Sequence, residues 1–342
     1  VAGTSITFGT PATFESVGGT AYNSPTFDST LNKVVIAYSD VRTSYGTGIV
    51  GTVAGTSISF GTPVTFHSGI ARYVGATFDS TANKVVIAYT DLSNGNVGKA
   101  IVGTVVATDI SYGTAVVFQN SSVQMNLGSQ LTFDSTNNKV VIGYTNYTNS
   151  GYGTAIVGTV AGTSISFGTA SVFEIVGASF TSMGTTFDST ANKVVIAYAN
   201  ATNGYGTAIV GTVAGTAITF GTPAVYEAAD TSYTSATFDS TANKVVIGYQ
   251  DVSNAAYGTG VVFALGSTNN TSFIGITAEA IANTATGPVN VYGGINAVQT
   301  GLTVASDYYV QVNGSLSTAS ASPAVKVGQA ISATTINLKD LT

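Results

Sequence analysis

An internal repeat of about fifty residues constrains this chain more than any other feature. The letters TFDST at 26–30, followed by an apolar run that ends at Tyr38, recur four more times. The aspartates that mark the copies are Asp28, Asp79, Asp134, Asp188 and Asp239, at spacings of 51, 55, 54 and 51 residues. This spacing is typical of one four-stranded β-propeller blade and is too long for one coil of a solenoid.

Each copy predicts four strands. A short strand around Phe27 ends in the turn DSTLN, where Asp28 can accept hydrogen bonds from neighbouring backbone amides. The second strand, 33–38, is a continuous apolar run, which is typical of a strand covered on both faces. A third strand, 48–53, and a fourth, 57–66, follow. The Gly-Thr-Pro at 61–63 predicts an interruption of the fourth strand, because proline cannot donate to a ladder.

The two ends of the repeat predict a closed ring. Residues 4–14 at the start of the chain have the sequence pattern of a fourth strand. The fifth copy stops after its third strand at 260–265. Pairing of the opening segment with the last strand would complete the last sheet and leave no open edge. We therefore predict an all-β fold in which residues 1–265 form a five-bladed β-propeller closed by the N-terminal strand. The alternative is an open array of hairpin repeats, as in an elongated β-solenoid or fibre.

Composition argues against several function classes. The chain has no Cys and a single histidine, His67, so thiolate sites, a Ser-His-Asp triad and a multi-histidine metal site are not expected. The net charge of −6 argues against a nucleic-acid partner, and no apolar run approaches the roughly 20 residues of a membrane helix. Most carboxylates belong to the repeat, so no isolated acid–base pair stands out. We expect no cofactor, no metal, no membrane insertion and no enzymatic activity.

The links between strands diverge unequally. The turn after strand one is nearly constant, and the turn after strand three is AGT in most copies, whereas the links after strands two and four vary in sequence and length. Alternate turns of an up-and-down sheet lie at the same end, so both variable links should share one face of the disc. Because loops carry binding while scaffolds carry packing, this variable face is the predicted ligand site. Unselected drift between copies is the alternative.

Candidate ligand contacts on the variable face are aromatic and basic side chains. One tyrosine position recurs in four copies, with Val97 in the other: Tyr45, Tyr152, Tyr205 and Tyr257. Candidates from single copies are Arg42, Arg72, His67, Tyr73, Phe180 and Tyr233. Aromatic faces beside Asn, Asp and Arg can stack on sugar rings and bind their hydroxyls, so a glycan is the predicted ligand class. For the recurring tyrosine, packing over the adjacent sheet is the alternative. The tyrosines that end strand two are expected to be core residues: Tyr38, Tyr89, Tyr144, Tyr198 and Tyr249.

The C-terminal part of the chain has a different pattern. Residues 266–271 are polar and predict a short linker, and 272–342 predict a separate small β module for attachment or oligomerisation. Within it, the two-residue turn Asn313–Gly314 between alternating strands predicts a hairpin.

The amino-acid sequence of this module resembles that of a known group of proteins. The letters FIGITAEAIA at 273–282, GLT at 301–303 and YYVQVNGSLST at 308–318 look like a module at the ends of tail-fibre and other virion surface proteins of tailed bacteriophages. The repeats TFDSTANKVVIAY and AGTSISFGTP are similar to repeats in the same kind of protein. The resemblance implies a virion appendage present in several copies, with other virion proteins as partners.

These observations together predict a non-enzymatic phage virion surface protein of the tail-fibre or decoration type. It is expected outside the cell on the particle surface, as a homo-oligomer that binds a host-surface glycan or a neighbouring virion protein. A purely structural repeat or fibre subunit without ligand is one alternative, and a secreted bacterial adhesin or lectin is another. A polysaccharide-cleaving propeller would require an acidic pair that converges in one pocket.

Overall fold

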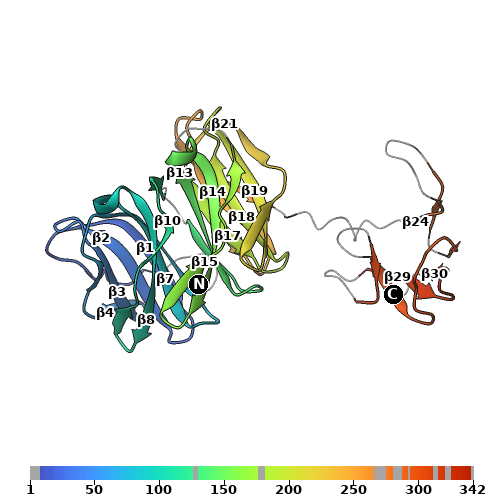
Figure 1. Ribbon diagram of the computed structural model, residues 1–342, viewed down its shortest axis with the longest axis horizontal. Coiled ribbons are helices and arrows are strands. Elements are labelled where there is room, and N and C mark those ends of the chain that lie inside the picture. The colour runs from blue at the N-terminus through green and yellow to red at the C-terminus, as the bar shows by residue number, and fades with distance from the viewer. Residues whose placement is uncertain are drawn as a thin grey trace. The chain divides into compact units, whose positions relative to one another are not determined.

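The computed structural model describes residues 8–125, 130–175, 182–263, 265, 275–279, 287–291, 293–310, 315–319 and 325–339. The chain forms two compact units, Val1–Phe263 and Ala264–Thr342. Regular structure in the described residues is β-strand, with two short 3-10 turns, as Figure 1 shows. The expectation of an all-β protein is therefore confirmed.

The first copy of the repeat folds into one antiparallel sheet. It contains β1 (Thr20–Asp28), β2 (Lys33–Asp40), β3 (Gly46–Ala54), β4 (Ser57–Phe60) and β5 (Val64–His67). Both β4 and β5 pair with β3, so the expected interruption at Gly-Thr-Pro divides the fourth strand into two short ones. The expected four-stranded unit is present with this division.

The later copies repeat this arrangement. The second sheet contains β6 (Ala71–Asp79), β7 (Lys84–Asp91), η1 (Leu92–Asn94), β8 (Val97–Val106), β9 (Asp109–Tyr112) and β10 (Val116–Gln119). The third contains β11 (Val123–Gln124), β12 (Leu131–Asp134), β13 (Lys139–Asn146), η2 (Tyr147–Asn149), β14 (Tyr152–Ala161), β15 (Ser164–Phe167) and β16 (Ser171–Glu174). The remaining strands are β17 (Met183–Asp188), β18 (Lys193–Ala199), β19 (Tyr205–Ala214), β20 (Ala217–Phe220), β21 (Ala224–Asp239), β22 (Lys244–Asp251) and β23 (Tyr257–Phe263). The long strand β21 joins two copies, because its first half pairs with β19 and its second half with β22.

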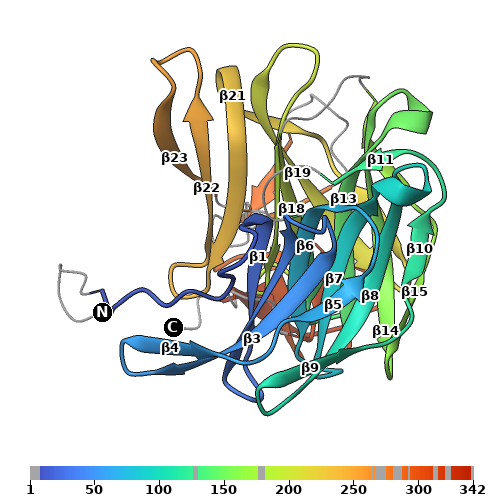
Figure 2. The ribbon, with the colours of Figure 1, turned by 90° about the vertical axis from the view of Figure 1, so that its left-hand side faces the viewer.

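The core lies between successive sheets. Val35 and Ala37 of β2 are fully buried against Val74 and Phe78 of β6, and the same kind of contact recurs between later sheets. The first strands of successive copies contact one another, and Figure 2 shows the sheets side by side like blades. Burial on both faces explains the unbroken apolar run of the second strand, and the fold is β-propeller-like.

The constant turns tie each sheet to the next. Asp28 Oδ1 accepts hydrogen bonds from the backbone amides of Thr30 at 3.0 Å and Leu31 at 2.9 Å, as expected. In addition, Thr30 Oγ1 donates to Asn83 Oδ1 in the turn of the second copy at 2.6 Å. The same threonine-to-asparagine bond joins each later pair of neighbouring turns, from Thr81 to Asn138, Thr136 to Asn192 and Thr190 to Asn243. A repeated sequence thus gives a repeated contact between copies.

Strand one is longer than the sequence suggested. In the second copy it begins at Ala71, well inside the stretch expected to be a link, and it contains a β-bulge between Arg72 and Gly75. The two residues of the bulge oppose a single residue of β7, which interrupts the alternation that marks a strand in sequence.

The expected ring closure is absent from the described contacts. Among the described residues, β23 pairs with β22 alone, and residues 8–14 form no strand. Instead, Phe14 packs on Tyr38 at 5.4 Å and Phe60 at 5.6 Å between ring centroids, both in the first sheet. Residues 4–7 of the expected closing strand lie outside the described residues. Among the described residues, β23 therefore lacks the outer-strand partner that β3, β8, β14 and β19 have.

The second unit is a small β structure with its own core. Its strands are β24 (Ile276–Thr277), β25 (Val289–Asn290), β26 (Ile295–Asn296), β27 (Asp307–Val310), β28 (Leu316–Ser317), β29 (Lys326–Ala330) and β30 (Ile336–Leu338). β27 and β28 pair antiparallel, as a hairpin requires, while the expected turn Asn313–Gly314 and the linker 266–271 lie outside the described residues. Val327 and Ile336 are fully buried in its core. In the part of the chain that the structure describes, no helix is long and apolar enough to span a membrane.

Candidate ligand-binding site

The bulge in strand one holds a tyrosine in three of the five copies. Tyr22, Tyr73 and Tyr233 occupy equivalent positions, six residues before the aspartate of the constant turn. Their φ angles are 55°, 52° and 51°, in the left-handed region. A bulky side chain is rare there, because its Cβ crowds the backbone, and each such residue costs about 1–3 kcal/mol.

The bulge separates the two residues that form it. The second bulge residue points inward, since Val74 is 4% exposed and Thr234 is fully buried. The tyrosine before it is 64% exposed in the last copy, at Tyr233, while Tyr22 and Tyr73 are half-buried and pack against the core. The bulge therefore places a tyrosine ring partly or fully at the surface beside an anchored backbone.

Two of these tyrosines come together. The ring centroids of Tyr22 and Tyr73 lie 5.0 Å apart with the planes tilted by 54°. Burial raises the pKa of Tyr73, the neighbouring Tyr22 adds to the rise, and the charge of Arg72 opposes it. Tyr147 of η2 also acts on this pKa, and its hydroxyl donates to Gln124 Oε1 at 2.7 Å. We call Tyr22, Arg72, Tyr73 and Tyr147 the tyrosine cluster; it draws on three successive copies.

The two variable links do meet at one end of the sheets. The amide of Ala71, after strand four, donates to the carbonyl of Ser44, after strand two, at 3.0 Å. Equivalent bonds run from Val123 to Asn96 and from Thr231 to Gly204. The links thus support one another across neighbouring copies and hold the bulge tyrosines at that end.

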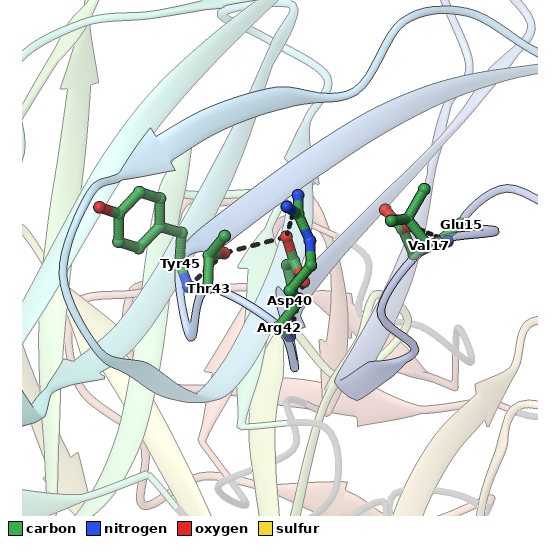
Figure 3. Close-up of polar contacts among 6 residues, drawn as sticks. All are labelled: Glu15, Val17, Asp40, Arg42, Thr43 and Tyr45. Atoms are coloured by element: carbon green, nitrogen blue, oxygen red, sulfur yellow. Dashed lines mark hydrogen bonds and ion pairs between the residues drawn. The ribbon is translucent and has the colours of Figure 1, made fainter.

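The recurring tyrosine after strand two lies apart from this cluster. Tyr45 is 38% exposed, and Figure 3 shows its ring pointing away from the ion pair of Arg42 with Asp40, at 3.9 Å. Tyr152 and Tyr205 are half-buried where β14 and β19 begin. Tyr257 is 62% exposed at the start of β23. Among the described residues, none of these four rings stacks on another aromatic ring. The structure therefore leaves them dispersed.

Arg42 is largely solvent-exposed and its pair with Asp40 is held by local turn bonds. Burial by itself raises the pKa of Asp40, but the Thr43 hydroxyl and the backbone amides that donate to the carboxylate lower it overall. An exposed pair of this kind contributes little to stability. Asp40 thus caps a turn, which leaves the Arg42 guanidinium facing solvent.

His67 lies between the first and second sheets. Its ring stacks on Tyr89 at 5.0 Å, and its Nε2 lies 3.1 Å from Asp91 Oδ1. Lys99 Nζ donates to Asp91 Oδ2 at 2.7 Å. Burial raises the pKa of Asp91, but the Lys99 hydrogen bond and the nearby His67 together lower it. Only 17% of the His67 side chain is exposed, so its main contacts are within the scaffold.

The same inter-sheet position carries an acid in other copies. Tyr198 donates its hydroxyl to Glu174 Oε2 at 3.0 Å, and Tyr249 donates to Glu227 Oε2 at 2.9 Å. At Tyr38, burial raises the pKa to about 12, and the nearby Glu15 carboxylate adds to the effect. These tyrosines are the expected core residues at the end of strand two.

Sequence reasoning missed two members of the tyrosine cluster, and one candidate is not described. Tyr22 was detectable, because it lies as far before Asp28 as Tyr73 lies before Asp79. Tyr147 had no such signal, since its copy alone has tyrosine there. Phe180 lies outside the described residues. In the described part of the chain, no group of three or more His, Cys, Asp and Glu side chains could hold a metal ion.

No protein-family model matches this chain, and no curated protein matches it. Among solved structures, it is similar to the leech intramolecular trans-sialidase complexed with 2,7-anhydro-Neu5Ac, at 11% identity and a TM-score of 0.46, covering 65% of this chain and 36% of the enzyme. It is similar to the intramolecular trans-sialidase of Ruminococcus gnavus, at 10% identity and a TM-score of 0.46, covering 72% and 78%. It is also similar to the exo-β-1,3-galactanase of Phanerochaete chrysosporium, at 9% identity and a TM-score of 0.39, covering 84% and 64%. The chain thus spans about a third of the leech enzyme, and these likenesses assign it no ligand.

The comparison corrects the expectation that the protein is not an enzyme. The three similar structures named above are of enzymes. The expectation rested on carboxylates dispersed along the repeat. In the fold, burial raises the pKa of Tyr249 to about 12, and the carboxylates of Glu227 and Asp251, from separate strands, add to the rise. Dispersal of carboxylates in sequence is therefore no measure of their separation in space.

Proposed function

We propose that the first unit binds carbohydrate at the variable face, around the bulge tyrosines Tyr22, Tyr73 and Tyr233. One observation carries the proposal: the same left-handed tyrosine occurs at the same bulge in three copies. Glycine or asparagine would relieve the strain at each position. Strain that a stable fold does not need is typical of ligand-binding positions.

The chemistry of the tyrosine cluster suits a sugar. The tilted rings of Tyr22 and Tyr73 offer an apolar surface that the C–H face of a pyranose can cover. The exposed Arg72 beside them offers hydrogen-bond donors for hydroxyl or carboxylate oxygens. An apolar platform with a few directed polar groups is the usual composition of a small-ligand site.

The test combines binding and stability in one variant. Tyr233→Asn removes an exposed ring and places a residue that tolerates the left-handed backbone. If the tyrosine serves a ligand, the variant gains thermal stability and loses about tenfold in affinity for the best glycan of an array screen, which is about 1.4 kcal/mol of binding free energy. A variant that binds as tightly as the parent contradicts the proposal, and so does a parent chain that binds no glycan.

Tyr257→Asn is the matched control. Tyr257 is 62% exposed against 64% for Tyr233, but it begins β23 outside any bulge. Unchanged affinity in this variant supports the bulge site. Loss of affinity here, with none in Tyr233→Asn, would move the site to the recurring tyrosines after strand two.

The finer predictions on location and assembly are proposals of the same kind. We propose that residues 272–342 attach the chain to a phage particle in several copies, as their wording suggests. Mass spectrometry of purified particles and light scattering of the isolated chain test the two parts. Absence from particles contradicts the first part, and a strict monomer contradicts the second.

A further inference from the structure

In the residues that the structure describes, the first and last copies each carry one partner of the hydrogen bond that joins neighbouring turns, without the other partner. Every described neighbouring pair of turns is joined by a threonine hydroxyl that donates to an asparagine of the next turn, as from Thr190 to Asn243 at 2.7 Å. The fifth copy has an equivalent donor in Thr241, and the first copy has an equivalent acceptor in Asn32. Asn32 shares the left-handed φ, 53°, of the asparagines that accept such bonds.

The first and last sheets also each have an exposed apolar face. Phe78 of the second copy is 9% exposed because it packs against the first sheet, while the equivalent Phe27 of the first copy is 54% exposed. Val50 of the first sheet is fully buried by the second, while the equivalent Val262 of β23 is 63% exposed. The exposed faces of the first and last sheets thus correspond to the two sides of every buried interface between them. We call this pair of faces the seam.

Among the described residues, the last sheet lacks an outer strand beside β23, while a segment with the outer-strand pattern, around Phe14, packs on the first sheet. In the first four copies a glycine of strand three lies under an aromatic ring of the outer strand, as Gly153 lies under Phe173. The equivalent Gly258 of β23 has no neighbour within 4 Å of its Cβ position. Phe14 meanwhile packs on Tyr38 and Phe60 of the first sheet, just as Phe173 packs on Tyr198 and Phe220.

We infer that the seam closes within one chain, with residues 8–15 as the outer strand of the last sheet. The register follows from the first sheet, where Thr47 pairs with Thr65 and Gly51 with Phe60. Thr259 would pair with Thr13 by the same spacing. The result is a ring of five blades, and Tyr233 would become the neighbour of Tyr22 as Tyr22 is the neighbour of Tyr73.

The missing outer strand is supplied by residues 8–15 of the same chain, because that segment already packs on the first sheet. Gly9 lies against the Thr56 carbonyl in the first sheet, as Gly61 lies against Thr108 and Gly168 against Thr216. A segment tethered in the same chain as its partner strand has an effective concentration up to the millimolar range, far above that of a second copy in dilute solution. Exchange between two copies is the outcome that would contradict this inference.

A disulfide test is clean because the chain has no cysteine. Thr13→Cys and Thr259→Cys are combined in the full chain and oxidised at low micromolar concentration. Thr47→Cys with Thr65→Cys is the positive control, because those positions already pair. Closure predicts a bridge within one chain, formed to the same extent as in the control and seen on non-reducing gels. A bridge only between two chains, or none while the control forms, would overturn the inference.

A second test measures the closed interface without cysteines. Gly258→Ala adds a Cβ where Phe14 would lie after closure, so it should lower Tm as much as Gly153→Ala does. Gly248→Ala is the control, because its Cβ also has no neighbour within 4 Å, and Ala37, Ala88 and Ala197 occupy the equivalent position. Equal Tm for the Gly258 and Gly248 variants would contradict closure. Neither test uses a glycan, so the disulfide and Tm results remain interpretable even if the chain binds no carbohydrate.

Discussion

Gly153→Ala should destabilise the first unit by about 1–2 kcal/mol, because the added Cβ would clash with a packed aromatic ring. An added Cβ would lie 2.5 Å from Phe173 Cε2 and 2.7 Å from its Cζ, distances that real Cβ atoms do not show. The ring cannot retreat freely, because Phe173 is 6% exposed and lies 5.3 Å from Tyr198 and 5.5 Å from Phe220. Overpacking of this kind costs about 1–3 kcal/mol, and alanine regains about 0.5–1 kcal/mol over glycine in a strand.

The measurement is the thermal midpoint of the purified chain by circular dichroism. For a unit of this size, about 1–2 kcal/mol corresponds to a fall in Tm of roughly 2–8 °C. Gly248→Ala is the matched control and should raise Tm slightly, since its Cβ meets nothing and only the gain of alanine over glycine in a strand remains. The reasoning is refuted if Gly153→Ala is as stable as Gly248→Ala. That result would mean that the rings between sheets are loosely packed.

Three further predictions follow from the buried polar groups. Tyr198→Phe removes the hydroxyl that donates to Glu174 and should cost about 1–2 kcal/mol in urea unfolding, and an unchanged midpoint would show that the bond contributes nothing. Because burial and nearby carboxylates raise the pKa of Tyr38 to about 12, its contribution to stability is complete below pH 10 and is lost as the pH rises toward 12; its ionisation followed at 295 nm should coincide with alkaline unfolding rather than precede it. Asp91→Asn leaves the Lys99 ammonium without its carboxylate and should cost about 3 kcal/mol, and it should also remove the part of the acid sensitivity below pH 4 that the lowered pKa of Asp91 causes; acid titrations of parent and variant that run parallel would contradict this.

Much of the fold was predictable because its signals are local. The apolar run after Lys33 identified a strand covered on both faces, and Asp28 in DSTLN identified the turn whose amides it accepts. Pro63 identified the break in the fourth strand. Each depends on neighbours within a few residues. The apolar run and the aspartate turn occur in all five copies, while the proline occurs in three, at Pro11, Pro63 and Pro223. The aromatic residues at the end of strand two were likewise identified as core.

The candidate site was only partly predictable. Tyr73 and Tyr233 were named as contacts from their sequence position, but the bulge that presents them was not foreseen. A bulge shifts the alternation by one residue and so reads as a loop. The partner of Tyr73 was missed for another reason: Tyr22 lies 51 residues earlier, and only the packing of two sheets brings the rings together.

The sequence by itself determined the repeat, the strands, the constant turns and the all-β class, because those depend on periodicity and local backbone preference. Only the tertiary structure decided which carboxylates meet a tyrosine, which glycines lie under rings, and that the first and last sheets each carry an exposed face. Such contacts join residues of different copies, and their distances are set by how one twisted sheet stacks on the next. Identical letters in Phe27 and Phe78 therefore give an exposed ring at one end of the array and a buried one inside it.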